Sequence, residues 1–226
     1  PSTVEKLNKE FGTNIKSTKT SQSSSSKKSS SKKMSPDAFI SKFGPIVKKA
    51  SPGSGVFPSV TLAQAILETG WGKSTIGDAN NMFGIKAKGS KTPYWKGESE
   101  TTQTIEYIKG QKGSYNLAFR KYASLEDSIK DHNLFLQKSR YSKAVQAKTP
   151  EEQAKEIKAA GYATDPKYAD KLISLIKKYD LKKFDDDMIK EKEGSRALSE
   201  RKIISEKNLR YLMKMLIKEN IDDRKP

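Results

Sequence analysis

The stretch from Thr61 to Ser74 constrains the fold more than any other part of the chain; it reads Thr-Leu-Ala-Gln-Ala-Ile-Leu-Glu-Thr-Gly-Trp-Gly-Lys-Ser. Its apolar residues recur at helical spacing and predict a helix, with Ser59 or Thr61 as the cap at its start. Gly70 and Gly72 should end that helix abruptly, because glycine readily adopts the left-handed backbone found at helix C-termini. Glu68 would then lie in the last helical turn, directly before the break.

Helical periodicity divides this helix into two faces. Glu68 falls on one face beside Thr61, Gln64 and Ala65, with Trp71 about one turn further on. From periodicity alone, a solvent-exposed glutamate is the simpler interpretation. Small residues and a tryptophan around the carboxylate instead favour a position at the edge of a cleft. The opposite face is apolar and predicts burial in the core; it comprises Leu62, Ala63, Ile66 and Leu67.

The composition excludes several kinds of chemistry. The chain has no cysteine, so disulfides, thiol nucleophiles and zinc–thiolate sites are impossible. His132 is the only histidine, which rules out a multi-histidine metal site, and we expect it to have a structural role. We therefore expect neither of these two kinds of metal site, and we expect no cofactor.

Charge and hydropathy narrow the range of partners. Forty-four Lys and Arg against 27 Asp and Glu give a net charge of +17, which favours anionic polymers as partners. Lysine dominates and no Arg-rich stripe alternates with aromatic residues, so specific nucleic-acid recognition is not expected. No apolar run reaches the roughly 20 residues that cross a bilayer, so no transmembrane segment is expected.

Changes in composition predict four segments. Residues 1–18 are a short amphipathic segment, faintly similar to half of a LysM glycan-binding repeat. Residues 19–35 are mostly Ser and Lys and predict a flexible basic linker. Residues 36–183 should form the folded domain, and residues 184–226 a helical extension. The apolar stripe within residues 188–221 needs a partner, either the folded domain or another chain or particle.

The order of elements predicts an α+β fold that is mostly α. Ser35 and Pro36 start a first helix, and residues 79–100 read as loop and short strand. Residues 101–122 alternate around a glycine-containing turn and predict a β-hairpin. Further helices should begin at Ser124, Thr149 and Asp165-Pro166. A cleft between a helical body and a hairpin lobe suits an extended substrate.

Two carboxyl groups are what glycosidic-bond hydrolysis usually requires, one of them protonated. Glu68 beside an aromatic wall can have its pKa raised by desolvation and so stay protonated. Glu106 lies on the polar face of the predicted hairpin and can supply the second carboxylate, with Glu98 and Glu100 as alternatives in the preceding loop. A purely structural pairing of Glu106 with a lysine across the hairpin stays open.

A series of motifs within residues 36–180 resembles the β-N-acetylglucosaminidases of glycoside hydrolase family 73. These are the flagellar and autolysin-type peptidoglycan hydrolases, and related domains occur in phage lysins. The motifs follow the same order as in that family. They are Ala63–Ser74, Asn80–Lys86, Thr104–Tyr107, Phe119–Tyr122, Ser128–His132 and Ala160–Ala169.

The resemblance implies a lysozyme-like fold, with a helical body and a small β-hairpin lobe. It also implies cleavage of the β-1,4 bond between N-acetylglucosamine and the following N-acetylmuramic acid, without a metal. Glu68 takes the place of the general acid, Glu106 of the second carboxylate and Tyr162 of a tyrosine at the site. The residues expected to contact the sugars are Gln64, Trp71, Asn81, Phe83 and Trp95. For Phe83 and Trp95, packing in the core is an equal alternative.

Several functional alternatives stay open at this point. If Glu106 activates water, the two carboxyl groups should stand about 6.5–9.5 Å apart and the reaction inverts; otherwise the substrate's acetamido group attacks. A muramidase or lytic transglycosylase of the same fold, or a non-catalytic wall-binding module such as a phage tail part, would share the pattern. The expected setting is extracellular, at the cell wall, as a secreted autolysin or phage-delivered lysin. Anionic wall polymers would be additional partners of the basic surface and linker.

Overall fold

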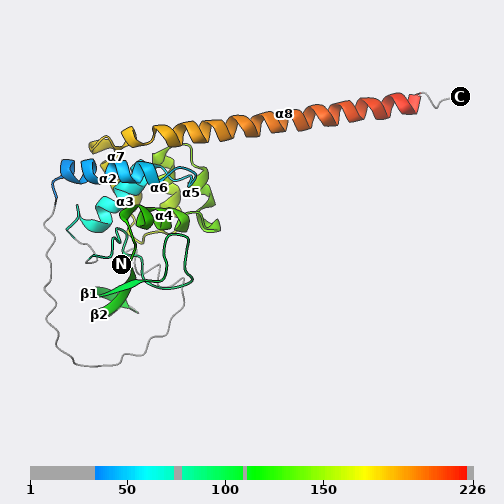
Figure 1. The fold of residues 1–226 in the computed structure, drawn as a ribbon. Helices are drawn as coiled ribbons and strands as arrows, with labels where there is room; N and C mark the ends of the chain where they lie inside the picture. Colours follow the sequence, from blue (N-terminus) through cyan, green and yellow to red (C-terminus); the bar gives the residue numbers. More distant parts are fainter. Residues whose placement is uncertain (1–33, 74–77, 109–110, 223–226) are drawn as a thin grey trace. The chain divides into compact units, whose positions relative to one another are not determined.

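The structure, a computed structural model, describes residues 34–73, 78–108 and 111–222, and in residues 105–108, 111–112 and 215–222 it describes the backbone only. The predicted segment 1–18 and nearly all of the predicted linker 19–35 lie outside the described residues. The chain divides into two compact units, and the boundary along the sequence lies between Met188 and Ile189. The first unit is a helical body from which a β-hairpin extends (Figure 1). The domain limits suggested by composition stay predictions.

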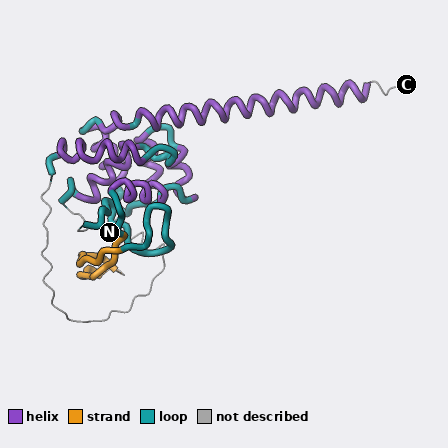
Figure 2. Tube along the Cα trace, viewed as in Figure 1, coloured by secondary structure: helices purple, strands orange, loops and turns teal. Residues whose placement is uncertain are grey.

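Helices make up most of the first unit (Figure 2). Three of them begin where the sequence predicted, at Ser35, Ser124 and Thr149, and each of these hydroxyl groups accepts a backbone N–H from three residues further on. Such capping satisfies donors that the first helical turn leaves unpaired. The helices are α2 (Pro36–Ala50), α3 (Pro58–Thr69), α4 (Leu125–Phe135), α5 (Ser142–Gln146), α6 (Pro150–Ala159) and α7 (Tyr168–Lys178), with 3-10 turns η1 (Ser139–Tyr141) and η2 (Leu181–Phe184).

Helix α3 is the centre of the body, because ten of its twelve residues are buried. The prediction that Ser59 or Thr61 caps this helix is wrong. Helix α3 begins at Pro58, and both residues are buried inside it. Ser59 donates its N–H and its O–H to the Asp185 carboxylate at 2.8 and 2.6 Å, and Thr61 donates to Asn133 Oδ1 at 3.1 Å. Tertiary partners thus satisfy hydroxyl groups that resemble caps in the sequence.

The face of α3 that carries Glu68 differs from the prediction. Thr61, Gln64 and Ala65 were expected beside Glu68 at the edge of a cleft, yet all three are fully buried. Helix α4 reaches Thr61 through Asn133, and α7 reaches Gln64 through Tyr168. Periodicity describes one apolar face, whereas this helix is covered on both sides by its neighbours.

The β-hairpin is confirmed. Strands β1 (Ser99–Ile108) and β2 (Gln111–Arg120) pair antiparallel, with Ser99 opposite Arg120 and Glu106 opposite Gly113. Thr102 and Thr104 are half-buried, whereas Thr101 and Gln103, which alternate with them, are exposed, as the alternation predicted. The hairpin therefore has one face turned towards protein and one towards solvent.

A buried polar cluster joins the base of the hairpin to α4. Arg120, the last residue of β2, donates to Asp131 Oδ2 at 2.7 Å and to the carbonyl of Lys88 at 2.8 Å. The Tyr122 hydroxyl donates to the same Asp131 oxygen at 2.6 Å, and Thr92 donates to Asp131 Oδ1 at 2.7 Å. The guanidinium also lies 4.2 Å above the ring of Trp95. One carboxylate thus holds together the hairpin, the preceding loop and the helical body.

The last two helices differ from the sequence expectations only at their ends. Helix α7 begins at Tyr168 rather than at Asp165-Pro166. Asp165 instead stabilises the turn before it, since Oδ1 accepts the Lys167 N–H at 2.9 Å and Oδ2 contacts Lys171 at 2.6 Å. Helix α8 (Asp186–Asp222) contains residues 188–221, where the apolar stripe was predicted, and lies within the predicted helical extension 184–226.

Candidate active site

Glu68 lies in the last turn of α3, and the chain ends this helix as the sequence predicted. Gly70 adopts a left-handed backbone with φ 54° and ψ 48°, and its N–H bonds to the carbonyl of Ile66. Thr69 secures the turn, because its hydroxyl donates to the Ala65 carbonyl at 2.7 Å and accepts the Gly72 N–H at 3.0 Å. Glu68 itself is half-buried. The break therefore leaves a partly exposed carboxyl group at the end of the central helix.

Two buried tyrosines lie within electrostatic reach of Glu68. Burial first, and then the charges of Tyr168 and Glu68, raise the pKa of Tyr162 well above its ordinary value. Burial and the charge of Glu68 raise the pKa of Tyr168 in the same way. Both phenols consequently stay protonated at neutral pH. Their rings stack with centroids 5.6 Å apart, so the position of each depends on the other.

His132 supports Tyr162 from the other side. Its Nε2 lies 3.1 Å from the Tyr162 hydroxyl, and its Nδ1 lies 3.4 Å from Asn133 Oδ1. Desolvation lowers the pKa of His132 to about 4, so the ring is neutral at pH 7. Since Asn133 Oδ1 can only accept, the ring proton is assigned to Nδ1, and Nε2 accepts from Tyr162. The expected structural role of His132 thus includes orienting the Tyr162 hydroxyl.

Three predicted site residues cluster around these groups, and none of them is open to solvent. Gln64 is fully buried, and its Nε2 donates to the Tyr168 hydroxyl at 3.1 Å. Phe83 is 1% exposed and stacks on His132, with centroids 3.8 Å apart and planes at 16°. Tyr162 is also buried. In this structure Gln64 and Phe83 position the aromatic groups, and a direct sugar contact for either stays a prediction.

The other predicted sugar-contacting residues have contacts of a different kind. Trp71 is half-buried between Phe39 and Tyr179, meeting their rings edge to face at 5.7 and 5.0 Å. Asn81 donates to the carbonyls of Ile85 and Arg120 at 2.8 and 2.9 Å, and so ties its loop to the end of β2.

Trp95 is buried at the base of the hairpin, where its Nε1 donates to the Glu98 carbonyl at 2.6 Å. The Arg120 guanidinium lies 4.2 Å from the centre of its ring. This is the packing role that the sequence left open for Trp95. Sugar contacts for Trp71, Asn81 and Trp95 stay predictions.

Glu106 lies near the end of β1, and its side chain is outside the described part of the molecule. Its backbone position, opposite Gly113, is the feature the structure supplies. The rival carboxylates differ in setting. Glu98 is exposed before β1, and Glu100 lies 3.8 Å from Lys121. Glu106 as the second carboxylate stays a prediction.

Sequence reasoning missed two features that shape the site. Tyr168 was not among the residues expected at the site, although its hydroxyl meets Gln64 and its ring lies beside Tyr162. The Arg120–Asp131 ion pair was not recognised, because both residues occur inside longer motifs with other charged residues.

Among the described residues, no three acidic or histidine side chains gather as a metal site, and no helix is long and apolar enough to span a membrane.

Comparison with known proteins gives consistent matches. The model of the glucosaminidase family, described as mannosyl-glycoprotein endo-beta-N-acetylglucosaminidase, matches residues 44–181. The peptidoglycan hydrolase FlgJ of Vibrio parahaemolyticus is 41% identical over 150 residues, which cover 64% of this chain and 47% of FlgJ. The exo-glucosaminidase LytG of Bacillus subtilis is 40% identical over 138 residues, which cover 58% of this chain and 47% of LytG. The chain thus spans about half the length of these curated relatives.

Solved structures agree with the sequence comparisons. The catalytic domain of the autolysin Auto from Listeria monocytogenes is 33% identical, with a TM-score of 0.58, and the match covers 66% of this chain and 86% of that domain. The helical body with its hairpin lobe has the lysozyme-like fold of these solved structures. The chain belongs to the glucosaminidase family, since the family model covers more than half of its 226 residues.

Proposed function

We propose that this protein is a peptidoglycan hydrolase that cleaves the β-1,4 bond after N-acetylglucosamine, with Glu68 as the general acid. The observation that carries this proposal is the setting of Glu68, half-buried at the end of α3 beside two tyrosines that stay protonated. The last helical turn is the negative end of the helix dipole, which disfavours a carboxylate there relative to a carboxylic acid. Membership of the glucosaminidase family supports the same bond type.

In the proposed reaction the Glu68 carboxyl group gives its proton to the glycosidic oxygen as the bond to the sugar's anomeric carbon breaks. The resulting oxocarbenium-like sugar is then attacked by water, whose proton passes to a second carboxylate. We assign that role to Glu106 from its place on β1. The alternative is that the acetamido group of the substrate attacks first, with Glu106 or Tyr162 assisting.

Digestion of purified peptidoglycan tests the bond that is cut. The products are reduced with borohydride and identified by mass spectrometry. Reduced N-acetylglucosamine ends support the proposal. Reduced N-acetylmuramic acid would show a muramidase, an anhydro end a lytic transglycosylase, and an absence of products a binding module; each of these outcomes contradicts it.

Single substitutions assign the carboxylates. Glu68→Gln should lose at least about a hundredfold in turnover, since a general acid contributes about 10²–10⁴-fold. Glu156→Gln on α6 is the matched control and should keep the wild-type rate. Glu106→Gln, Glu98→Gln and Glu100→Gln are compared in the same assay, and only the first should lose activity. Wild-type turnover in Glu68→Gln would remove the central claim.

An exo mode of cleavage is the second candidate, because LytG is named an exo-glucosaminidase. An exo enzyme releases single sugars from a chain end, whereas an endo enzyme shortens the glycan strands from the first minutes. Following strand length by size-exclusion chromatography separates the two modes. We favour endo cleavage because the family description names an endo enzyme.

The proposed place of action is the cell wall, outside the cell, as the substrate requires. Anionic wall polymers are proposed as additional partners because the net charge is +17. Retention on purified wall should therefore weaken as salt is raised, since screening shortens the reach of exposed charges.

A further inference from the structure

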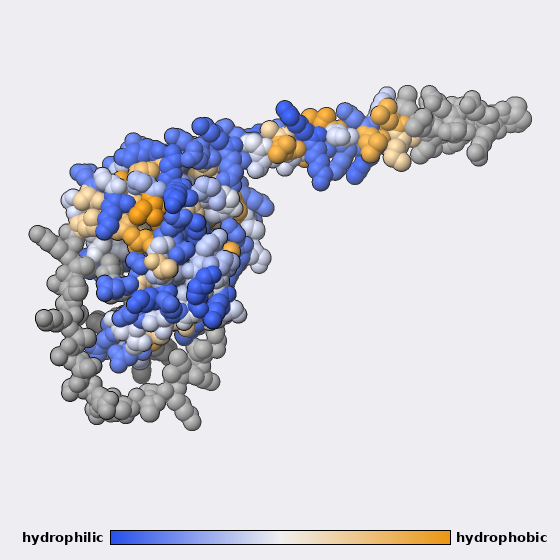
Figure 3. All heavy atoms as spheres, viewed as in Figure 1, coloured by the Kyte–Doolittle hydropathy of each residue, from blue (hydrophilic) through white to orange (hydrophobic). Residues whose placement is uncertain are grey.

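Gln64 carries a buried oxygen atom that has no hydrogen-bond donor in the described part of the molecule. Its side chain is 0% exposed inside the first unit, whose visible face is mostly hydrophilic (Figure 3). Its Nε2 donates to the Tyr168 hydroxyl at 3.1 Å, so Oε1 lies on the other side of the amide. Among the described atoms, no donor reaches this Oε1. A buried acceptor without a donor is unfavourable, and it therefore points to a partner that the amide is placed to receive.

Helix geometry makes the carboxyl group of Glu68 the neighbour of this amide. Gln64 and Glu68 are four residues apart within α3, so they share one face of the helix and lie one turn apart. The side chain of a helical residue leans towards the helix N-terminus and covers the preceding turn. The Glu68 side chain therefore extends from the end of α3 back towards Gln64.

Tyr168 connects the same two residues from α7. Its hydroxyl accepts the Gln64 N–H, and burial and then the charge of Glu68 raise its pKa well above the ordinary value. The hydroxyl is thus close enough to sense Glu68 while it holds the amide of Gln64. This contact turns the NH₂ of the amide towards α7 and leaves the carbonyl oxygen for a donor on α3.

We propose that Gln64 is a positioning residue for the proton of Glu68: its Oε1 accepts a hydrogen bond from the protonated carboxyl group and so favours the acid form. An ionised carboxylate has no proton to donate and would face the amide oxygen as a second acceptor, so the same contact disfavours it. Gln64 thereby keeps Glu68 ready to donate. This role rests on the proposed function of Glu68 as general acid, whereas the hydrogen bond itself can be tested without catalysis.

Other ionisable groups around α3 could influence Glu68 and have to be separated from Gln64. Tyr162 and Tyr168 stay protonated at neutral pH, and Glu106 lies on β1 with its side chain outside the described residues. Burial raises the pKa of Asp185 to about 6, so an activity profile alone would mix its titration with that of Glu68. Groups with partners of their own on the elements packed against α3 include Lys48 and Lys49 on α2, His132 on α4 and Glu151 on α6.

Direct titration of Glu68 in the full chain tests the proposal. With ¹³C at the carboxyl carbon of glutamate, the Glu68 signal is the one missing from Glu68→Gln, and Asp185 gives no signal. Gln64→Met keeps the length of the side chain and removes the amide oxygen. It should shift the protonation equilibrium of Glu68 about threefold to tenfold, which lowers its pKa by about 0.5–1, since a neutral hydrogen bond contributes about this much. The matched control is Gln137→Met, whose amide donates to the Ser54 carbonyl and which should leave the Glu68 pKa unchanged.

A second variant keeps Gln64 and removes the group that orients it. Tyr168→Phe should lower the Glu68 pKa in the same direction but by less, because the amide is then free to turn. An unchanged Glu68 pKa in Gln64→Met, or in Tyr168→Phe if Gln64→Met fails to fold, would overturn the proposal. A rise in Gln64→Met would overturn it as well, since it would show that the NH₂ faces an ionised carboxylate.

Activity then connects the hydrogen bond to catalysis. The general acid works only while protonated, so the fall of kcat/KM at high pH should move to lower pH in Gln64→Met, by the same amount as the Glu68 pKa. A lower Glu68 pKa together with wild-type turnover in Glu68→Gln would uphold the hydrogen bond and refute the proposed function. Loss of turnover in Glu68→Gln with an unchanged Glu68 pKa in Gln64→Met would do the reverse.

Discussion

Asp131→Asn should destabilise the helical body strongly, although it changes only a few atoms. Asparagine can keep its oxygen towards Arg120 and Tyr122, but its NH₂ would face the Thr92 hydroxyl, which already accepts the N–H groups of Tyr94 and Trp95 and loses its own acceptor. The substitution therefore removes the charge and one hydrogen bond. Asp131 and Arg120 side chains are 2% and 9% exposed, so the guanidinium would be left buried without a counter-ion.

The expected loss in the free energy of unfolding follows from the burial of this ion pair. Leaving one member of a buried ion pair without its partner costs about 3–5 kcal/mol. Arg120 keeps the Lys88 carbonyl at 2.8 Å and the Trp95 ring at 4.2 Å, so we expect the lower end, about 3 kcal/mol. With an m-value of about 2 kcal/mol per molar urea, the unfolding midpoint should fall by about 1.5 M.

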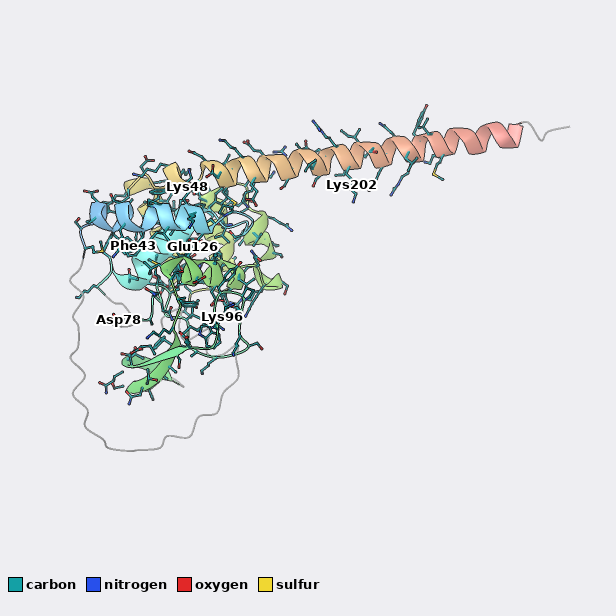
Figure 4. The ribbon with its side chains drawn as sticks, in the orientation of Figure 1. Phe43, Lys48, Asp78, Lys96, Glu126 and Lys202 are labelled. Atoms are coloured by element: carbon teal, nitrogen blue, oxygen red, sulfur yellow. The ribbon has the colours of Figure 1, made fainter. Side chains whose placement is uncertain are left out.

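Urea unfolding of four proteins measures this effect: wild type, Asp131→Asn, Arg120→Met and the double variant. The double variant should lose less than the sum of the singles, since neither charge is then left alone. Glu126→Gln is the control (Figure 4): Glu126 also meets two lysines, at 2.7 and 2.9 Å, but is exposed enough that the loss should stay below about 1 kcal/mol. Additive losses, or a loss in Asp131→Asn no larger than the control, would refute the reasoning.

Three further predictions concern stability. Burial lowers the pKa of His132 from 6.5 to about 4. Between these two pH values the unfolded chain binds a proton on His132 that the folded chain does not bind. The free energy of unfolding should therefore fall as pH falls from 6.5 to 4. His132→Gln should lack this component in urea titrations across that range; an unchanged profile would contradict it. Gly44→Ala should lower the free energy of unfolding by about 1–3 kcal/mol, because the added Cβ would overlap the Phe184 ring. Gly194→Ala in α8 should raise it by about 0.5–1 kcal/mol, because its Cβ would meet nothing within 4 Å and alanine favours a helix. Equal effects in thermal unfolding would count against the close approach of Gly44 to Phe184. A Cβ at Gly70 would also meet nothing within 4 Å, but the backbone there has φ 54°. Gly70→Ala should therefore lower the free energy of unfolding by about 1 kcal/mol through backbone strain, and a loss several times larger would contradict this cause.

Much of the fold was predictable from the sequence because it depends on local chemistry. Ser35, Ser124 and Thr149 cap helices as predicted, since a hydroxyl group before a helix needs only the next three residues. Gly70 ends α3 for the same kind of reason, because its left-handed backbone is a property of glycine itself. The hairpin followed from alternation on either side of a glycine-containing turn. The family followed from several motifs in a fixed order.

The surroundings of Glu68 were decided only by the tertiary structure. The sequence placed Gln64 on the same exposed face as Glu68, yet α7 covers it and brings Tyr168 to its amide. Tyr162 meets His132, 30 residues away in the chain, in a contact that no local pattern encodes. Burial of one face depends on every element packed against it, whereas periodicity reports only one helix at a time. The sequence by itself therefore determined where the carboxyl group stands on its helix, and the packing of α4 and α7 determined what surrounds it.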